Sequence, residues 1–215
     1  MKRRHFAVLA VSAGAACALR PGDDGSAAAD TNSLPLYESS DLTPQWRSAA
    51  ELALPPRPFV PFSLQDQSSR TLTPANLQGR VVVANFFFTH CSSICPKLTS
   101  AMAQVRDAYR GQSRLLLLSH SVTPEFDTPP MLQAYAQANR IDGRQWRLLT
   151  GTPEHISRVA HEGYLVPRTA VGADGIIHTE LFVLLDAQQR VRGVYNGTLR
   201  LDVQQLIGDV KTLLA

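Results

Sequence analysis

The stretch RVVVANFFFTHCSSICP, residues 80–96, constrains the fold of this chain more than any other part of it. Its first half is apolar apart from one arginine and one asparagine, as expected of a strand that is buried on both faces. A sheet buried on both faces needs helices on either side. Pro96 stands where the first turn of a helix is expected, because proline fits there without losing a hydrogen bond. The stretch therefore predicts a strand, a loop and a helix of an α/β fold, with Cys91 and Cys95 at the junction.

Strand and helix patterns alternate through the rest of the chain. Short apolar or β-branched runs predict further strands at residues 115–118, 146–149, 176–185 and 191–195. The last two form a hairpin that turns around residues 187–189. Residues 59–73 predict an earlier hairpin that turns at Gln67 and Ser68. Apolar residues at helical spacing predict helices over residues 96–111, from Pro129 onward, over 153–163 and over 201–214.

These elements indicate the fold class. Asp127 or Thr128 is expected to cap the helix that begins at Pro129. A strand, a pair of cysteines and a helix near the start of the domain are typical of thioredoxin-like proteins. We therefore expect an α/β fold with a thioredoxin-like mixed sheet flanked by helices, and with an N-terminal hairpin extension.

The first residues, MKRRHFAVLAVSAGAACALR, have the layout of an export signal. A basic tip precedes a short Ala-rich apolar stretch, which is shorter than the roughly 20 apolar residues of a spanning helix. The Arg3-Arg4 pair is also compatible with a twin-arginine signal. Cys17 is a candidate lipidation site, although the residues before it match a lipobox poorly. We expect a periplasmic protein whose signal is either cleaved or kept as a membrane anchor.

Composition and charge support three segments in the chain. Residues 1–20 form the signal, residues 21–57 a flexible and irregular linker, and residues 58–215 one domain. The formal charge of +3 is concentrated in the signal, and the remaining chain has 17 basic against 18 acidic residues. Such a balance argues against a nucleic-acid partner. It leaves the membrane as a partner only through an uncleaved N-terminus.

Cys91 and Cys95 are the only cysteines outside the signal. In an oxidising compartment such a pair is a structural disulfide, a redox couple or a metal site. A structural disulfide across so short a loop would stabilise the fold little. Free N–H groups at a helix start favour thiolates, and two soft thiolates favour Cu(I), with zinc as the competitor. The pattern alone does not choose between redox chemistry and metal binding.

Two thiolates seldom complete a metal site, so a third ligand is expected among the six histidines, one of which lies in the signal. His155 and His161 are expected on the surface of a helix. His90 adjoins the pair and is expected to pack beside it or tune it. His120 ends a strand near the expected active face and is a candidate supporting group. His178 enters a predicted strand and is a candidate ligand, although a lone strand histidine is more often packed or exposed.

At this point the sequence resembles a known family. FTHCSSICP is similar to the F-T-H-C-x-x-x-C-P motif of the Sco/SenC family, thioredoxin-fold copper proteins that serve cytochrome c oxidase. The likeness continues in SVTPEFDTPPMLQAYA, WRLLTG and DGIIHTELFVLLD, and spans roughly residues 58–213. It implies that Cys91, Cys95 and His178 align with the copper ligands. Two features differ from the family: Thr123 replaces an aspartate, and residues 166–177 approach the histidine differently.

The resemblance implies a copper metallochaperone rather than an enzyme. Cys91, Cys95 and His178 would bind Cu(I), and also Cu(II), for the dinuclear copper centre of cytochrome c oxidase subunit II or for another copper protein. The alternative is a periplasmic thiol–disulfide oxidoreductase, in which Cys91 attacks, Cys95 resolves, and a thioredoxin-like reductant restores the pair. It would act on cysteines of the oxidase subunit or of another copper protein. A peroxidase is a third, weaker reading, based on Thr89 before the first cysteine.

Overall fold

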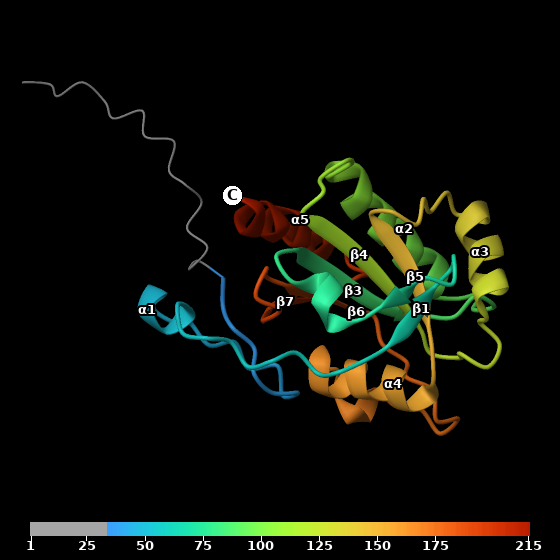
Figure 1. Ribbon diagram of the computed structural model, residues 1–215, viewed down its shortest axis with the longest axis horizontal. Coiled ribbons are helices and arrows are strands. Elements are labelled where there is room, and N and C mark those ends of the chain that lie inside the picture. The colour runs from blue at the N-terminus through green and yellow to red at the C-terminus, as the bar shows by residue number, and fades with distance from the viewer. Residues whose placement is uncertain (1–33) are drawn as a thin grey trace, which may run out of the picture.

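One mixed sheet organises residues 34–215, the part of the chain that the computed structural model describes (Figure 1). Its strand order is β2-β1-β5-β4-β3-β6-β7. The strands are β1 Leu64–Asp66, β2 Thr71–Leu72, β3 Val81–Phe87, β4 Leu115–Ser121, β5 Trp146–Thr150, β6 Leu181–Leu185 and β7 Val191–Asn196. The three central strands β3, β4 and β5 run parallel, and the strands at both edges pair antiparallel. The expected β1–β2 hairpin extends the sheet beyond β5.

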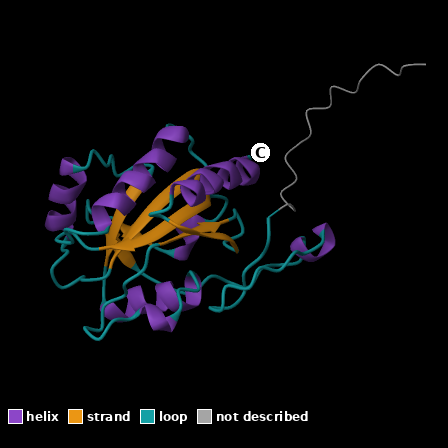
Figure 2. Ribbon diagram, turned by 180° about the vertical axis from the view of Figure 1, so that it is seen from behind, coloured by secondary structure: helices purple, strands orange, loops and turns teal. Residues whose placement is uncertain are grey.

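Helices cover both faces of this sheet (Figure 2). The α-helices are α1 Ala49–Leu52, α2 Cys95–Ala108, α3 Pro129–Ala138, α4 Pro153–Arg158 and α5 Arg200–Leu214. Shorter helical segments are η2 Pro74–Leu77, η3 Val159–Gly163 and η4 Arg168–Ala170. Buried side chains of α2, α3 and α5 form one core, and those of α4 and η3 form the other. None of the described helices combines the length and apolar character that a membrane crossing requires.

Strand β3 shows why two cores form. All seven of its residues are buried. Val81 and Val83 face the core of α2 and α5, whereas Val82 and Ala84 face the core of α4. Side chains alternate between the faces of a strand, so a continuous apolar run supplies both layers at once. The prediction of a mixed α/β sheet flanked by helices is therefore confirmed.

Two predicted strand boundaries near the site differ in the structure, and one predicted helix cap is confirmed. Strand β4 continues to Ser121, past the predicted end at Leu118, because its last residues pair in parallel with β3. Strand β6 begins at Leu181 and not at residue 176, so His178 lies in a loop and not in a strand. Of the two residues predicted to cap α3, Thr128 is the N-cap residue, while Asp127 points into the protein interior. The predicted helix start is correct, but the Asp127 carboxylate accepts hydrogen bonds from residues distant from the helix, such as Thr89.

Residues 34–58 run beside β7 and are irregular apart from α1. The buried guanidinium of Arg192 donates to the carbonyl oxygens of Leu34 and Pro35 and to Asp186. The N–H of Tyr37 donates to the carbonyl of Val191 at 2.9 Å. These bonds hold the segment against the sheet. The predicted signal, Cys17 and the first part of the predicted linker lie outside the described residues, so the division into three segments stays a prediction.

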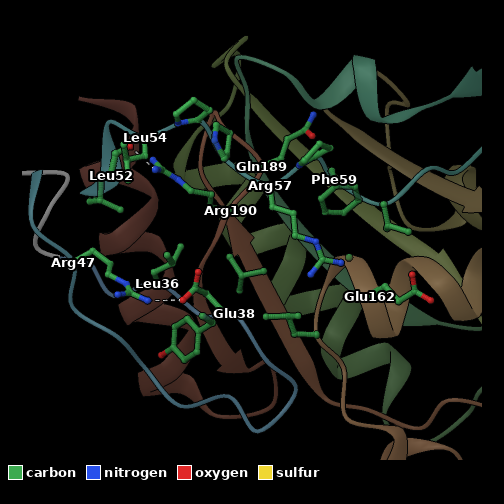
Figure 3. A pocket seen from close by; sticks show the side chains of 18 of the residues that line it. Leu36, Glu38, Arg47, Leu52, Leu54, Arg57, Phe59, Glu162, Gln189 and Arg190 are labelled. Carbon is green, nitrogen blue, oxygen red and sulfur yellow. Dashed lines mark hydrogen bonds and ion pairs between the residues drawn. The ribbon is translucent and has the colours of Figure 1, made fainter. Parts of the chain in front are cut away.

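A cavity of about 370 Å³ lies between this segment and the domain (Figure 3). Its walls include Leu36, Leu54 and Phe59. An ion pair of 2.7 Å between Arg47 and Glu38 lies at its side. No residue that the sequence analysis proposed for the site lines this cavity. The chemistry predicted from the cysteines belongs to a different part of the molecule.

Candidate functional site

The two cysteines lie where β3 leads into α2, as predicted. Cys91 is partly exposed in the loop, and Cys95, the first residue of α2, is only 3% exposed. Both are free thiols. The backbone N–H of Cys95 donates to the Sγ of Cys91 at 3.4 Å, and the hydroxyl of Ser93 lies 3.8 Å from the same sulfur. The helix start therefore directs its free N–H groups at the outer thiol.

These surroundings separate the two thiols in acidity. Burial opposes ionisation of Cys91, but hydrogen bonds from the Cys95 thiol and from backbone N–H groups outweigh it and lower its pKa to about 7. Burial raises the pKa of Cys95 to about 12, helped by its hydrogen bond with Cys91 and by the negative charge of Asp127. Near neutral pH about half of the outer sulfur is therefore ionised to the thiolate, while the inner sulfur keeps its proton.

Asp127 is a buried carboxylate beside the cysteine loop. It accepts hydrogen bonds from the hydroxyls of Thr89 at 2.5 Å, Ser121 at 2.6 Å and Thr123 at 3.2 Å, and from the N–H of Thr89 at 3.2 Å. Asp127, two residues before α3, is thereby joined to Thr89, which lies two positions before Cys91. Sequence reasoning treated Asp127 only as a possible helix cap. Thr123 stands where the family usually has an aspartate. Its hydroxyl donates a hydrogen bond to Asp127, so a carboxylate is still present beside this position.

His178 lies in the loop before β6. Its side chain is 50% exposed, and its Nε2 lies 2.9 Å from a carboxylate oxygen of Asp174. Both His178 and Cys95 line a cavity of about 400 Å³, which is also walled by Phe87, Leu98 and other apolar residues. Among the described residues, no three histidine, cysteine or acidic side chains are gathered closely enough to hold a metal ion. The structure brings the predicted ligands to one region without joining them, so the ligand set stays a prediction.

Two of the other histidines are buried, and only His161 was expected on the surface. His120 is fully buried in the core of α4, stacked on Phe86 and 3.1 Å from the hydroxyl of Tyr164, and burial lowers its pKa to about 3. His120 does not itself line the cavity of Cys95, but Phe86, on which it stacks, does, so its supporting role stays a prediction. His161 is buried, not exposed, and its Nδ1 lies 2.7 Å from the carbonyl oxygen of Val166. Both side chains point into the core. The spacing of residues in the sequence does not show which face of a strand or helix is buried, because that depends on packing against distant segments.

The remaining two histidines agree better with prediction. His155 is half-buried on α4, with Nδ1 3.2 Å from the carbonyl oxygen of Ser63. His90 packs edge-on against Phe88 and Phe126, at ring distances of 5.1 and 5.7 Å. Its expected packing role beside the cysteines is confirmed.

The donor groups fit a soft metal ion. Two cysteine sulfurs and an imidazole favour Cu(I) over hard cations, and they also suit zinc. The same pair of thiols, one ionised and one buried, also fits thiol–disulfide exchange. Geometry alone supports both kinds of chemistry.

Comparison with known proteins places the chain in a family. Residues 54–215 match the family model described as SCO1/SenC. This chain belongs to the SCO1/SenC family. The SCO1 protein homolog of Bacillus subtilis (strain 168) is 30% identical over 155 residues, which cover 71% of this chain and 80% of that relative. The resemblance noted from FTHCSSICP is thereby confirmed.

Solved structures of SCO1/SenC proteins share the thioredoxin-like fold. A family lipoprotein from Bacillus anthracis str. Ames aligns with a TM-score of 0.64 and 29% identity, covering 73% of this chain and 95% of that one. A second structure is BsSco, a member of the Sco family of cytochrome c oxidase assembly proteins in which a disulfide switch was identified. It aligns with a TM-score of 0.61 and 29% identity, covering 73% of this chain and 92% of that one. Copper-bound ScoI of Bradyrhizobium japonicum aligns with a TM-score of 0.58 and 26% identity, covering 73% of this chain and 99% of that one.

Proposed function

We propose that this protein is a copper metallochaperone that carries the ion on Cys91, Cys95 and His178. The observation that carries the proposal is the cavity at the start of α2, which Cys95 and His178 both line while Cys91 stands at the mouth of the same helix. The copper-bound Bradyrhizobium japonicum ScoI supports copper as the cargo. The description of BsSco as a cytochrome c oxidase assembly protein supports that oxidase as the destination.

The roles of the three side chains follow from their surroundings. Cys91, with a pKa of about 7, offers a thiolate from a partly exposed position. Cys95 has a pKa of about 12 and gives up its proton when it coordinates, because a bound cation favours the thiolate. His178 completes the set from an exposed loop. Few ligands and an exposed sulfur also suit release to an acceptor.

The acceptor in this proposal is the dinuclear copper centre of cytochrome c oxidase subunit II, reached in the periplasm after export. Mixing the copper-loaded protein with the copper-free soluble domain of that subunit tests the assignment. The absorption bands of the dinuclear centre should grow as copper leaves this protein. Persistent copper on this protein, with no new bands, would remove subunit II as the acceptor.

Copper titration of the fully reduced protein tests the ligand set. Competition with a Cu(I) chelator should show one tight site in the wild type and weaker binding in Cys91→Ser, Cys95→Ser and His178→Ala. His155→Ala is the matched control, because it removes a partly exposed imidazole that lies away from the cavity. Wild-type affinity in His178→Ala would refute the histidine assignment, and no binding in the wild type would refute the function.

A second function is favoured by the separation in acidity between the two thiols. The Cys91 thiolate attacks a disulfide of a substrate protein and forms a mixed disulfide, and the first substrate thiolate leaves. Cys95 then loses its proton and attacks the Cys91 sulfur, which releases the second substrate thiolate. Two electrons pass to the substrate, and a Cys91–Cys95 disulfide remains for a thioredoxin-like reductant to restore.

The two functions respond differently to the same substitution. Thiol–disulfide exchange should proceed at a similar rate in His178→Ala, whereas copper affinity should fall. Exchange with small dithiols, followed with the oxidised protein, measures the first property. A protein that exchanges with no dithiol at a measurable rate would leave copper binding as the function of the pair.

A further inference from the structure

The loop that carries His178 contains a carboxylate held at both of its oxygens. One oxygen of Asp174 accepts a hydrogen bond from the backbone N–H of Ile176, with 3.0 Å between oxygen and nitrogen. The other lies 2.9 Å from the Nε2 of His178. One oxygen is therefore fixed by the turn that contains Asp174, and the second contacts the imidazole ring.

The backbone of this loop forms a small hairpin that fixes the two side chains relative to each other. The N–H of Gly172 donates to the carbonyl of Ile176 at 2.8 Å, and a bridge pairs Val171 with Ile177. Gly175 turns the chain with a φ of +77°. The N–H of His178 donates to the carbonyl of Ala170 at 2.7 Å. Asp174 thus lies at the tip, and His178 lies on the outgoing arm.

Gly172 leaves room for the ring. A Cβ at this position would lie 2.9 Å from the Cδ2 and 3.2 Å from the Nε2 of His178, and 2.7 Å from Asp174. The Cδ2–Nε2 edge of the ring therefore rests over Gly172. Nδ1 is not among the three atoms that would lie nearest to such a Cβ.

The hydrogen-bonding chemistry then assigns the ring proton. An ionised carboxylate only accepts hydrogen bonds, so the Nε2 that contacts Asp174 carries the hydrogen. A neutral imidazole has a single N–H, which leaves the lone pair on Nδ1. Metal-binding histidines commonly donate their second ring N–H to a carboxylate, which orients the ring.

We propose that Asp174 is a positioning residue that holds the Nε2–H of His178, so that Nδ1 is the nitrogen offered to the metal. Gly172 provides the space in which this pair forms. The inference rests on the proposed copper function and adds to it which nitrogen binds and what selects it.

The first test needs no metal. Nitrogen-15 NMR of the imidazole in the reduced, metal-free protein should show His178 as the Nε2–H tautomer. In Asp174→Ala the ring should shift to a mixture of tautomers, and Asp174→Asn, which keeps an accepting oxygen, should restore much of the wild-type signal. Asp142→Ala is the matched control, because Asp142 is an exposed turn aspartate whose carboxylate accepts N–H groups of Arg144 and Gln145. An unchanged tautomer in Asp174→Ala would overturn the proposal.

The second test uses Cu(I) in competition with a chelator. Asp174→Ala should weaken binding about 10- to 100-fold, the usual effect of losing a carboxylate behind a metal-binding histidine. Gly172→Ala should weaken binding with Asp174 still present. Unchanged binding in Asp174→Ala would overturn the proposal, and so would tighter binding, which would mean that Asp174 competes with the metal for Nε2. His178→Ala separates this proposal from the proposed function. If that variant binds Cu(I) as tightly as the wild type, His178 is not a ligand, and the proposed ligand set is refuted.

Discussion

The backbone N–H of Cys95 points at the Sγ of Cys91, with 3.4 Å between nitrogen and sulfur. The inner cysteine therefore supports the thiolate of the outer one through its own main chain. Cys95 itself is buried at the helix start and keeps its proton. The start of one helix thus gives two cysteines different reactivity: Cys91 is readily ionised, and Cys95 stays protonated.

Alkylation should distinguish these two sulfurs. Because the thiolate is the nucleophile, the rate at Cys91 should rise with pH and reach half of its maximum near pH 7. Cys95, with a pKa of about 12, should stay unmodified at pH 7.5. Mass spectrometry after brief iodoacetamide treatment of the reduced, metal-free protein measures both. Equal labelling of the two residues would contradict the assignment, and Cys91→Ser should label slowly.

The buried His120 should make the protein acid-sensitive. Its pKa is about 3 when folded, against about 6.5 when unfolded, so between these values the unfolded chain binds a proton that the folded protein does not. Stability is therefore full above pH 6.5 and falls as the pH drops toward 3, by up to about 1.4 kcal/mol per pH unit. Denaturant unfolding between pH 7 and pH 4 measures this slope. His120→Gln should have a shallower slope; an equal slope would assign the effect to other groups.

Asp127→Ala should destabilise the domain by about 3 kcal/mol, because it leaves the buried hydroxyls of Ser121 and Thr123 and the partly buried hydroxyl of Thr89 without their acceptor. The substitution should also lower the pKa of Cys95, since a nearby negative charge is removed. Urea unfolding and Cys95 alkylation at alkaline pH measure these effects. Asp142→Ala, at an exposed turn, should change stability by no more than about 0.5 kcal/mol. Similar stability of both variants would argue against the network.

Arg192→Met should release residues 34–58 from β7. The substitution leaves Asp186 with one fewer cationic partner and removes the donor to the carbonyl oxygens of Leu34 and Pro35. Breaking a buried ion pair in this way should cost about 3 kcal/mol. Brief trypsin digestion should then cut faster in this segment than in the wild type. Arg144→Met, at an exposed arginine, is the control, and equal digestion of both variants would contradict the role of Arg192.

Much of the fold was predictable because its signals are local. The run at Val81–Phe87 showed a strand with both faces buried, and Pro96 showed where a helix begins. The stripe of Leu98 and Met102 identified the helix face that packs inward. These patterns depend on the repeat of the backbone itself, which neighbouring residues reveal without any long-range contact.

What required the tertiary structure was the partner of each polar side chain. Spacing did not show that His120 would lie beside Tyr164, or that Asp127 would accept hydrogen bonds from Thr89 and Ser121. Nor did it show that His178 would lie in a loop and line the same cavity as Cys95. The sequence by itself determined the strands, the helices and the cysteine pair, because their periodicity is set within a few residues. Strand pairing between distant segments decided the surroundings of each group, and those surroundings determine its proton and its partners.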